Sequence, residues 1–471
     1  MDAAASTKTA SRAAWRAEFV ALLALGVPMA LTQLIQYSVL TVDVLMIGRL
    51  GPEPLAASSL GLVIFFAAWL IGFGPAMAVS PLISQSLGAD AANVDDVRRS
   101  VRMGLWAVVL MAPVVILVFL MTETIARALG QPPSLAAMAG PYVIALAPGW
   151  VFAMGVLVLR NFLAAIGETR APLLIVLATT LLNAFGNWLL IYGNWGFPRL
   201  ELVGAGIASS VVNAAGFLAL VWFIRADARA RRFDLFRDVM TPDWPRFREV
   251  VRLGWPIGIA VAFEGMLFNA CVFLMGRIGV TEVAAYQVAL NVASIAFMAP
   301  LGLSMAGSVR VGLAAGAGDW PRVRRAAALT IALAIGAIMI VAVPVMAFPG
   351  VVAGFYLDAD DPANAGVLPL VARFLVIAAA FMLFDATQVA TAQALRGLKD
   401  VRWPMLITGL AYWGVGFPAA AYLGLVSPLG AIGVWWGLLL GLLAAATMLA
   451  VRLYLLTRGR GAEPPLTLRQ P

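Results

Sequence analysis

Apolar residues form long, nearly unbroken runs along this chain, and short polar loops separate the runs. A run of at least about 19–20 residues can cross the hydrocarbon core of a bilayer as a helix. Twelve such runs cover residues 19–47, 55–86, 101–121, 135–165, 172–192, 203–225, 252–276, 283–311, 326–348, 368–395, 404–424 and 430–456. The pattern therefore predicts an all-α membrane protein with twelve transmembrane helices.

The positive charges indicate how these helices cross the membrane, because Lys and Arg concentrate in cytoplasmic loops. With a cytoplasmic N-terminus, the tails and the even-numbered loops hold 27 of the 32 Lys and Arg residues, including the eight arginines from Arg225 to Arg252. The opposite side carries an acidic loop with Asp358, Asp360 and Asp361. We therefore expect a multi-pass protein with both termini in the cytoplasm.

Composition supports this assignment and excludes several classes of protein. The chain is 62% hydrophobic and only 12% charged, whereas soluble domains carry about 25% charged residues. The net charge of +8 is spread over short loops, so we expect no binding of nucleic acid. Cys271 is the only cysteine and histidine is absent, so no disulfide within the chain and no imidazole ligand can form. The first 18 residues contain no apolar core, so we expect no cleaved signal peptide.

An internal repeat divides the chain into two halves. Residues 26–28 (GVP) align with residues 254–256 (GWP) at a shift of 228, and the GRLG motif at 48–51 recurs as GRIG at 276–279. Six helices per half give both halves the same orientation, which predicts two six-helix bundles related by a pseudo-twofold axis along the membrane normal. The predicted parts are a cytoplasmic tail (1–18), an N-lobe (19–228), a cytoplasmic linker (229–250), a C-lobe (251–456) and a second cytoplasmic tail (457–471). The basic linker either connects the lobes or lies as a short amphipathic segment on anionic lipid.

Glycine and proline interrupt corresponding apolar segments of the two halves. Gly74 in the second segment aligns with Gly302 in the eighth, and such residues either allow close helix packing or form a hinge. Pro28 and Pro256 also align, and we place both near the starts of their helices, where proline is tolerated.

Three acidic residues lie inside apolar segments: Asp43, Glu264 and Asp385. A carboxylate at this depth costs at least about 2.5–3.5 kcal/mol, so it is expected to face a cavity or a partner. Three such acids favour a protein that handles cations or protons inside the membrane. Any one of them could instead be a structural hydrogen-bonding group.

In the second half, Glu264 and Asp385 on neighbouring helices would form a site with two carboxylates. Gln388, Asn269 and Gln287 could supply further oxygen atoms. An all-oxygen site suits a hard cation, and two close carboxylates could also hold a proton.

In the first half, Asp43 could be joined by Asn183 and Asn187, which lie one helical turn apart. Gln36 lies two turns before Asp43 on the same helix face and aligns with Glu264 in the repeat. Buried amides at such spacing often only hold helices together, so both a functional and a structural role are open.

Several motifs together resemble one known family. They include Pro28, Gln33, VDVLMIGRLG at 42–51 and LAA at 55–57, then GWP at 254–256, Glu264, GRIG at 276–279, AAYQ at 284–287, Asn291, DATQ at 385–388 and LRGLKD at 395–400. This series resembles the multidrug and toxic compound extrusion (MATE) transporters, in particular their NorM-like branch, over nearly the whole chain.

The resemblance implies a pair of six-helix bundles in the bacterial inner membrane that exports organic cations in exchange for inward Na⁺ or H⁺. It implies a cation site at Glu264 and Asp385, which would hold Na⁺ if sodium is the coupling ion. It also implies a proton- or substrate-linked site at Asp43, Asn183 and Asn187. NorM-like sites can add an aromatic hydroxyl near the C-lobe acids, but this chain has Phe381 and Phe297 there.

Other functions are less consistent with the sequence. A lipid-linked oligosaccharide flippase of the same superfamily should have basic residues in its cavity, and the apolar segments are nearly free of them. No motif of a nucleotide-binding loop, a metalloprotease or a serine nucleophile is present, which argues against an enzyme. A channel fits a two-lobed repeat less well than a carrier. We expect small organic cations and the lipid bilayer as partners, no cofactor apart from the coupling ion, and a monomer.

Overall fold

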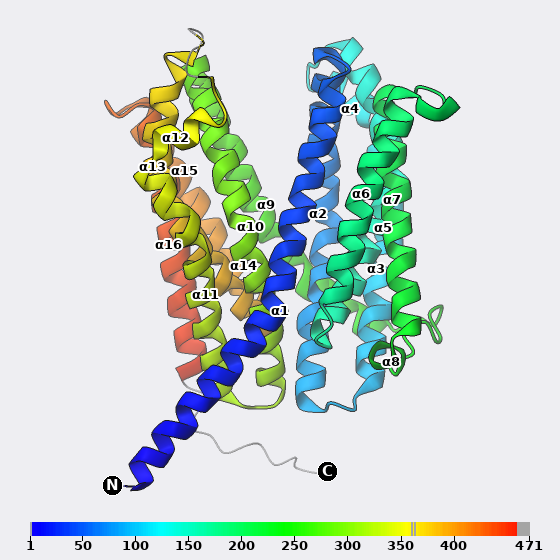
Figure 1. The fold of residues 1–471 in the computed structure, drawn as a ribbon, viewed down its shortest axis with the longest axis vertical. Helices are drawn as coiled ribbons and strands as arrows, with labels where there is room; N and C mark the ends of the chain where they lie inside the picture. The colour runs from blue at the N-terminus through cyan, green and yellow to red at the C-terminus, as the bar shows by residue number, and fades with distance from the viewer. Residues whose placement is uncertain (1, 359–360, 362–363, 459–471) are drawn as a thin grey trace. The chain divides into compact units, whose positions relative to one another are not determined.

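The computed structural model describes residues 2–358, 361 and 364–458, with side chains from residue 12 onward. Every regular element in this part of the chain is helical (Figure 1). The long helices are α1 (Asp2–Gly48), α2 (Pro52–Ala89), α3 (Val94–Leu120), α5 (Pro133–Ala165), α6 (Arg170–Tyr192), α7 (Glu201–Ala226), α9 (Trp244–Ile278), α10 (Val280–Gly316), α11 (Trp320–Ala347), α13 (Val367–Gly397), the continuous run of α14 (Arg402–Gly409), η3 (Leu410–Gly416) and α15 (Phe417–Leu425), and α16 (Ala431–Arg458). Short helices are α4 (Thr122–Ala128), η1 (Asn194–Gly196), α8 (Ala228–Arg231) and α12 (Pro349–Gly354).

The predicted fold class is confirmed. Over the described residues, 12 helices are long and apolar enough to cross a membrane, and each overlaps one predicted segment. The helices extend beyond the apolar runs, because polar residues at their ends continue the helix. Residues 2–18, predicted as a tail, are helical, and α9 begins at Trp244 rather than at 252. The predicted C-terminal tail beyond Arg458, Asp360 and the side chain of Lys8 lie outside the part described.

Helix packing divides the chain into two compact units. The C-unit comprises Met1–Ala30 and Ala260–Pro471, and the N-unit comprises Leu31–Ile259. The predicted lobes divide the chain at the linker, whereas the units divide it inside α1 and α9. The first part of α1 therefore packs with the C-unit, and the first part of α9 packs with the N-unit.

Close contacts between helix backbones account for this division. In the C-unit, a Cβ atom added to Gly302 of α10 would lie 2.3 Å from the Cα of Ala30 in α1. In the N-unit, a Cβ atom added to Gly74 of α2 would lie 2.2 Å from the carbonyl oxygen of Gly254 in α9. Both distances are too short for any side chain, so each crossing requires glycine. The structure thus favours close packing as the role of this aligned glycine pair.

The two aligned prolines lie inside their helices, which corrects the expectation that they lie near helix starts. Pro28 follows more than seven turns of α1, and Pro256 follows about three turns of α9. The polar sequences before them continue the helix, which the apolar pattern alone did not indicate. A proline inside a helix removes one backbone hydrogen bond and favours a bend. Both prolines lie within four residues of the boundary between the units.

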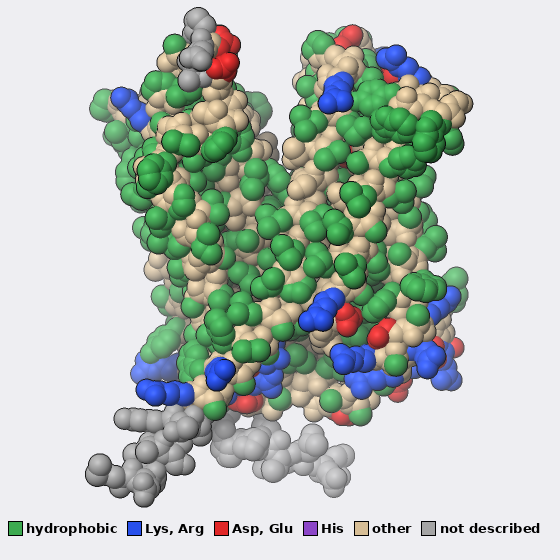
Figure 2. Space-filling model, in the orientation of Figure 1, with side chains coloured by type: hydrophobic (Ala, Val, Ile, Leu, Met, Phe, Trp, Pro, Cys, Tyr) green, Lys and Arg blue, Asp and Glu red, His purple; other side chains and the backbone are tan. Residues whose placement is uncertain are grey.

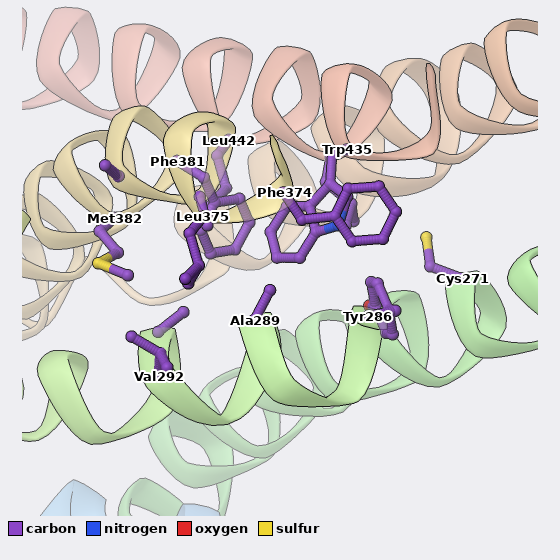
Figure 3. Close-up of a cluster of buried hydrophobic side chains, with 14 of the residues drawn as sticks. Cys271, Tyr286, Ala289, Val292, Phe374, Leu375, Phe381, Met382, Trp435 and Leu442 are labelled. Carbon is purple, nitrogen blue, oxygen red and sulfur yellow. The ribbon is translucent and has the colours of Figure 1, made fainter. Parts of the chain in front are cut away.

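Aromatic side chains fill the centre of the C-unit (Figure 3). Trp435 of α16 contacts Phe374 and Phe381 of α13 and Tyr286 of α10, with ring centroids 5.4–6.0 Å apart. Cys271 of α9 is buried at the edge of this cluster. Burial of such large rings stabilises the unit by roughly 1.5–3 kcal/mol each, so this cluster fixes α10, α13 and α16 against one another.

The linker between the halves packs on the N-unit. Arg98 of α3 donates to the carbonyl oxygens of Phe233 and Asp234 at 3.1 Å, and the Trp106 indole donates to the carbonyl of Val239 at 2.8 Å. The Phe233 ring is fully buried and packs edge-on against Phe162 of α5. These contacts hold the linker on protein, which favours its interpretation as a connecting segment over one that lies on lipid.

Ion pairs join the polar ends of the helices in each unit. In the C-unit, buried Glu18 of α1 accepts two hydrogen bonds of 2.7 Å from Arg310 and one of 3.2 Å from Arg322. In the N-unit, Arg246 of α9 pairs with Asp96 of α3 at 3.6 Å. Glu18 and Arg246 are 228 residues apart, so corresponding positions of the repeat carry opposite charges and both find a partner.

Asp243 precedes α9 and joins it to α3. Its carboxylate accepts a hydrogen bond from the backbone N–H of Arg246 and another from the Arg99 guanidinium. The hydrogen bond from Arg99 holds the pKa of the Asp243 carboxyl below its usual value. On the face of the N-unit shown in Figure 2, Lys and Arg side chains gather near α8, and hydrophobic side chains cover the helix sides.

Candidate functional site

Two acids come together in the C-unit, one half-buried (Glu264) and one buried (Asp385). Glu264 lies in the middle of α9, and Asp385 lies in the middle of α13, where it is 6% exposed. Their carboxyl groups are close enough to interact electrostatically. Asp385 Oδ1 is buried without a hydrogen-bond partner among the described residues. A pair of this kind attracts a cation or a proton, because two adjacent negative charges in a medium of low polarity repel each other strongly.

Two further residues interact with this pair, and the sequence did not indicate either of them. Tyr412 of η3 is fully buried and interacts electrostatically with both Glu264 and Asp385. Arg396, in the last turn of α13, interacts electrostatically with Glu264. The ion pairs within 4.0 Å found in the described part of the chain do not include either acid. Arg396 is therefore near the acid pair, but among the described residues it forms no ion pair with either acid.

The other predicted members of this site differ in their positions. Gln388 is buried one turn after Asp385 on the same helix. Asn269 is exposed and donates to the carbonyl of Gly265 in its own helix at 2.8 Å. Gln287 is also exposed. Of these three residues only Gln388 is buried, which favours it as an additional member of the site, and the roles of Asn269 and Gln287 stay predictions.

A second polar cluster lies in the N-unit. The Asn187 amide of α6 donates to Asp43 of α1 at 2.5 Å and to the Asn183 side-chain oxygen at 3.2 Å. Asn183 in turn donates to Ser209 of α7 at 3.4 Å. Tyr142 of α5 interacts electrostatically with Asp43. Three helices, α1, α6 and α7, thus contribute to one hydrogen-bonded cluster around Asp43, and α5 adds Tyr142 through its electrostatic interaction.

The sequence indicated only part of this second cluster. It predicted the grouping of Asp43, Asn183 and Asn187 that the structure shows, but it missed Ser209 and Tyr142, whose residue types are common in membrane helices. Gln36 is exposed, and its place in the cluster stays a prediction.

A half-buried arginine also lies in the N-unit. Arg160 is inside α5, where its guanidinium donates to the Gln33 side-chain oxygen of α1 at 3.2 Å. The charge pattern assigned both Arg160 and Arg396 to cytoplasmic loops. The structure places both within helices near their C-terminal ends, where cations interact favourably with the helix dipole.

Comparison with known proteins identifies the family. The MatE family model matches residues 28–189 and 256–422, which together make up more than half of the chain. The chain belongs to the MatE family. The two matches begin 228 residues apart, the same shift as the internal repeat, so each half of the chain corresponds to one copy of the MatE unit.

Relatives in the MatE family cover nearly the full chain. The chain is 42% identical to the probable multidrug resistance protein NorM of Rhizobium meliloti, over 96% of both chains, and 39% identical to that of Mesorhizobium japonicum, also over 96% of both. Its fold is similar to that of a mutant of the Vibrio cholerae MATE transporter VcmN (TM-score 0.85, 18% identity, 95% of this chain and 98% of the other). It is also similar to the eukaryotic MATE transporter AtDTX14 (TM-score 0.82, 20% identity, 95% and 99%).

Proposed function

We propose that this MatE protein is a multidrug efflux antiporter, which exports organic, mostly cationic compounds in exchange for inward Na⁺ or H⁺ by alternating access. Relatives that are 42% and 39% identical over nearly their full length are named probable multidrug resistance proteins NorM. The twelve apolar helices and the two compact units support a carrier in the membrane.

The observation that carries the coupling part of this proposal is the acid pair of the C-unit. When both acids are ionised, Glu264 and Asp385 carry two negative charges, and Arg396 supplies one positive charge within reach of Glu264 only. One negative charge is then unbalanced in a buried site, where an uncompensated charge is costly. One Na⁺ or one proton restores the balance.

Binding of that cation from outside can drive export. Each elementary charge that moves inward across the membrane gains about 2.3 kcal/mol per 100 mV. The acid pair binds the ion in the outward-accessible state and releases it in the inward-accessible state, so the cycle couples ion entry to substrate exit. Asp43 of the N-unit provides a second acid, which we assign to a proton- or substrate-linked site with Asn183 and Asn187.

The surroundings of the protein follow from the same reasoning. We place the chain in a bacterial inner membrane, with both termini in the cytoplasm, because basic residues concentrate in the tails and even-numbered loops. We expect it to act as a monomer, since each predicted site is assembled within one chain. We expect no catalytic activity and no cofactor apart from the coupling ion.

Dye efflux from reconstituted vesicles tests the proposal. Purified protein is tested under an imposed Na⁺ gradient and, separately, under an imposed pH gradient. We expect one gradient to drive efflux by the wild type and neither to drive efflux by Glu264→Gln or Asp385→Asn. Glu123→Gln is the matched control, because Glu123 is a partly exposed acid paired with Arg127 on its own helix.

Each outcome of the efflux assay tests a different part of the proposal. Failure of both gradients to drive the wild type would refute antiport. Full efflux by both acid variants would leave antiport in place and refute the assigned ion site. Loss of efflux in the Glu123→Gln control would show that the assay responds to the removal of any acid.

A further inference from the structure

Tyr412 lies in an unusual stretch of backbone beside the acid pair. Residues Leu410–Gly416 form a π-helical segment, η3, between α14 and α15. Such segments are rare, occur mostly as single-turn bulges and are frequent at functional sites. The wider π-helical turn changes the direction of the side chains relative to a regular helix. The backbone of this segment therefore determines where the Tyr412 ring points.

Contacts at both ends of η3 hold it in place. A Cβ atom added to Gly409 would lie 2.9 Å from the ring of Phe263, the residue before Glu264 in α9. A Cβ atom added to Gly416 would lie 3.1 Å from the Cα of Gly441 in α16. One end of η3 therefore rests on α9 beside Glu264, and the other end rests on α16.

The Tyr412 hydroxyl lacks the partner that a buried hydroxyl normally has. The side chain is fully buried, and its oxygen has no hydrogen-bond partner among the described residues. Asp385 Oδ1 is likewise buried and unpartnered. Buried polar atoms are nearly always hydrogen-bonded, so each of these two atoms requires an explanation. Tyr412 also interacts electrostatically with both acids.

Another buried tyrosine of the same unit shows the contrasting, structural arrangement. The Tyr286 hydroxyl of α10 donates to the carbonyl oxygen of Phe268 at 3.1 Å, and the Tyr286 ring packs against Trp435. Its hydrogen bond is satisfied within the protein core. The two tyrosines are equally buried, and only Tyr412 interacts electrostatically with the acid pair.

We propose that the Tyr412 hydroxyl is a third member of the coupling-ion site, together with the Glu264 and Asp385 carboxyl groups. The lone pairs of a phenolic oxygen can face a cation that the carboxyl groups bind. Phe381 has no hydroxyl to contribute to the site, and its ring packs in the aromatic core against Trp435. The inference rests on the proposed antiport and adds a residue to its ion site.

Removal of the hydroxyl should weaken ion binding without destabilising the fold. In Tyr412→Phe, we expect the concentration of the driving ion at half-maximal dye efflux to rise about tenfold, which is the size of one lost interaction with a charged group. The melting temperature should stay within about 2 °C of the wild type, because no hydrogen bond of the fold is lost. Efflux at saturating ion concentration should be retained.

Tyr286→Phe is the matched control, because it removes the same atom from an equally buried tyrosine. We expect it to lower the melting temperature, since it loses a buried hydrogen bond, and to leave the half-maximal ion concentration unchanged. The two variants should thus show opposite patterns in the two measurements.

The outcomes separate this inference from the function on which it rests. If the wild type responds to neither ion gradient, antiport and the role of Tyr412 both fail. If the wild type responds and Tyr412→Phe has the same ion dependence, antiport holds and the inference fails. Equal shifts of ion dependence in both tyrosine variants would also overturn it, because loss of any buried hydroxyl would then suffice.

Discussion

Glu18 offers the most direct test of the packing of α1 with the C-unit. Glu18 is 5% exposed and binds Arg310 through two hydrogen bonds and Arg322 through a third. The substitution Glu18→Gln removes the negative charge but keeps the size of the side chain. It leaves the Arg310 guanidinium, whose side chain is only 15% exposed, without its counterion. We therefore expect this single change to destabilise the C-unit.

The size of the effect follows from the burial of the three side chains. Breaking a buried ion pair by neutralising one partner costs about 3–5 kcal/mol. Arg322 is 33% exposed, so solvent screens its share, and a pair at that exposure adds at most about 1 kcal/mol. Gln can still accept one hydrogen bond. We therefore expect a loss near the lower limit, about 3 kcal/mol, which corresponds to roughly 6–12 °C in melting temperature.

Thermal unfolding of the purified protein in detergent measures this loss. The control is Glu201→Gln, which removes an acid that is 51% exposed and pairs with exposed Arg199. We expect the control to change the melting temperature by less than about 2 °C. Equal shifts for the two variants, or no shift for Glu18→Gln, would refute the assigned contribution of this ion pair.

A double variant tests whether the loss is electrostatic. In Glu18→Met with Arg310→Met, both charges are replaced by apolar side chains, and such replacements are often neutral or stabilising. We expect the double variant to be more stable than either single variant. Additive losses would show that packing, not the uncompensated charge, causes the effect.

Three further predictions test other parts of the structure. Because the pKa of Asp243 is lowered, this carboxylate stabilises the fold above its ordinary pKa of about 4 and loses that contribution as the pH falls through the lowered pKa. Asp243→Asn should thus be less stable by up to about 1 kcal/mol at pH 7 and converge with the wild type on acidification, as thermal unfolding across pH would show. Gly302→Val should abolish the folded peak in size-exclusion chromatography, whereas Gly336→Val, at a site with open space, should retain it. Asn187→Ala should cost about 1–3 kcal/mol in thermal unfolding and Asn213→Ala less than 1, because the Asn213 amide bonds only its own helix.

Much of the fold could be predicted from the lengths of the apolar runs. Backbone groups in a bilayer must be paired internally, so a run of that length is almost always a helix. The acids Glu264 and Asp385 were also predictable. Because a carboxylate inside the bilayer is unfavourable in free energy, an acid in an apolar run indicates a functional or structural role.

The remaining parts depend on tertiary packing, which the sequence pattern does not encode. Tyr412 lies in a run with Trp413 and Phe417, where a tyrosine is typical of an interfacial anchor, and the run gives no sign of its π-helical backbone. Arg396 comes directly after the predicted apolar run 368–395, so the sequence pattern assigned it to a cytoplasmic loop. The exchange of the first parts of α1 and α9 between units arises from backbone crossings at single glycines, which resemble any other glycine in a membrane helix.

The exchanged helix ends impose an order on the assembly of this protein during its synthesis. Residues before Ala30 leave the ribosome first, but the C-unit residues that pack against them are made much later. Glu18 in particular has no arginine partner until Arg310 and Arg322 have been translated. The N-unit can close earlier, as soon as the chain up to Ile259 is inserted. A nascent chain that is arrested between these two points therefore holds a complete N-unit, while its Glu18 still lacks both arginine partners.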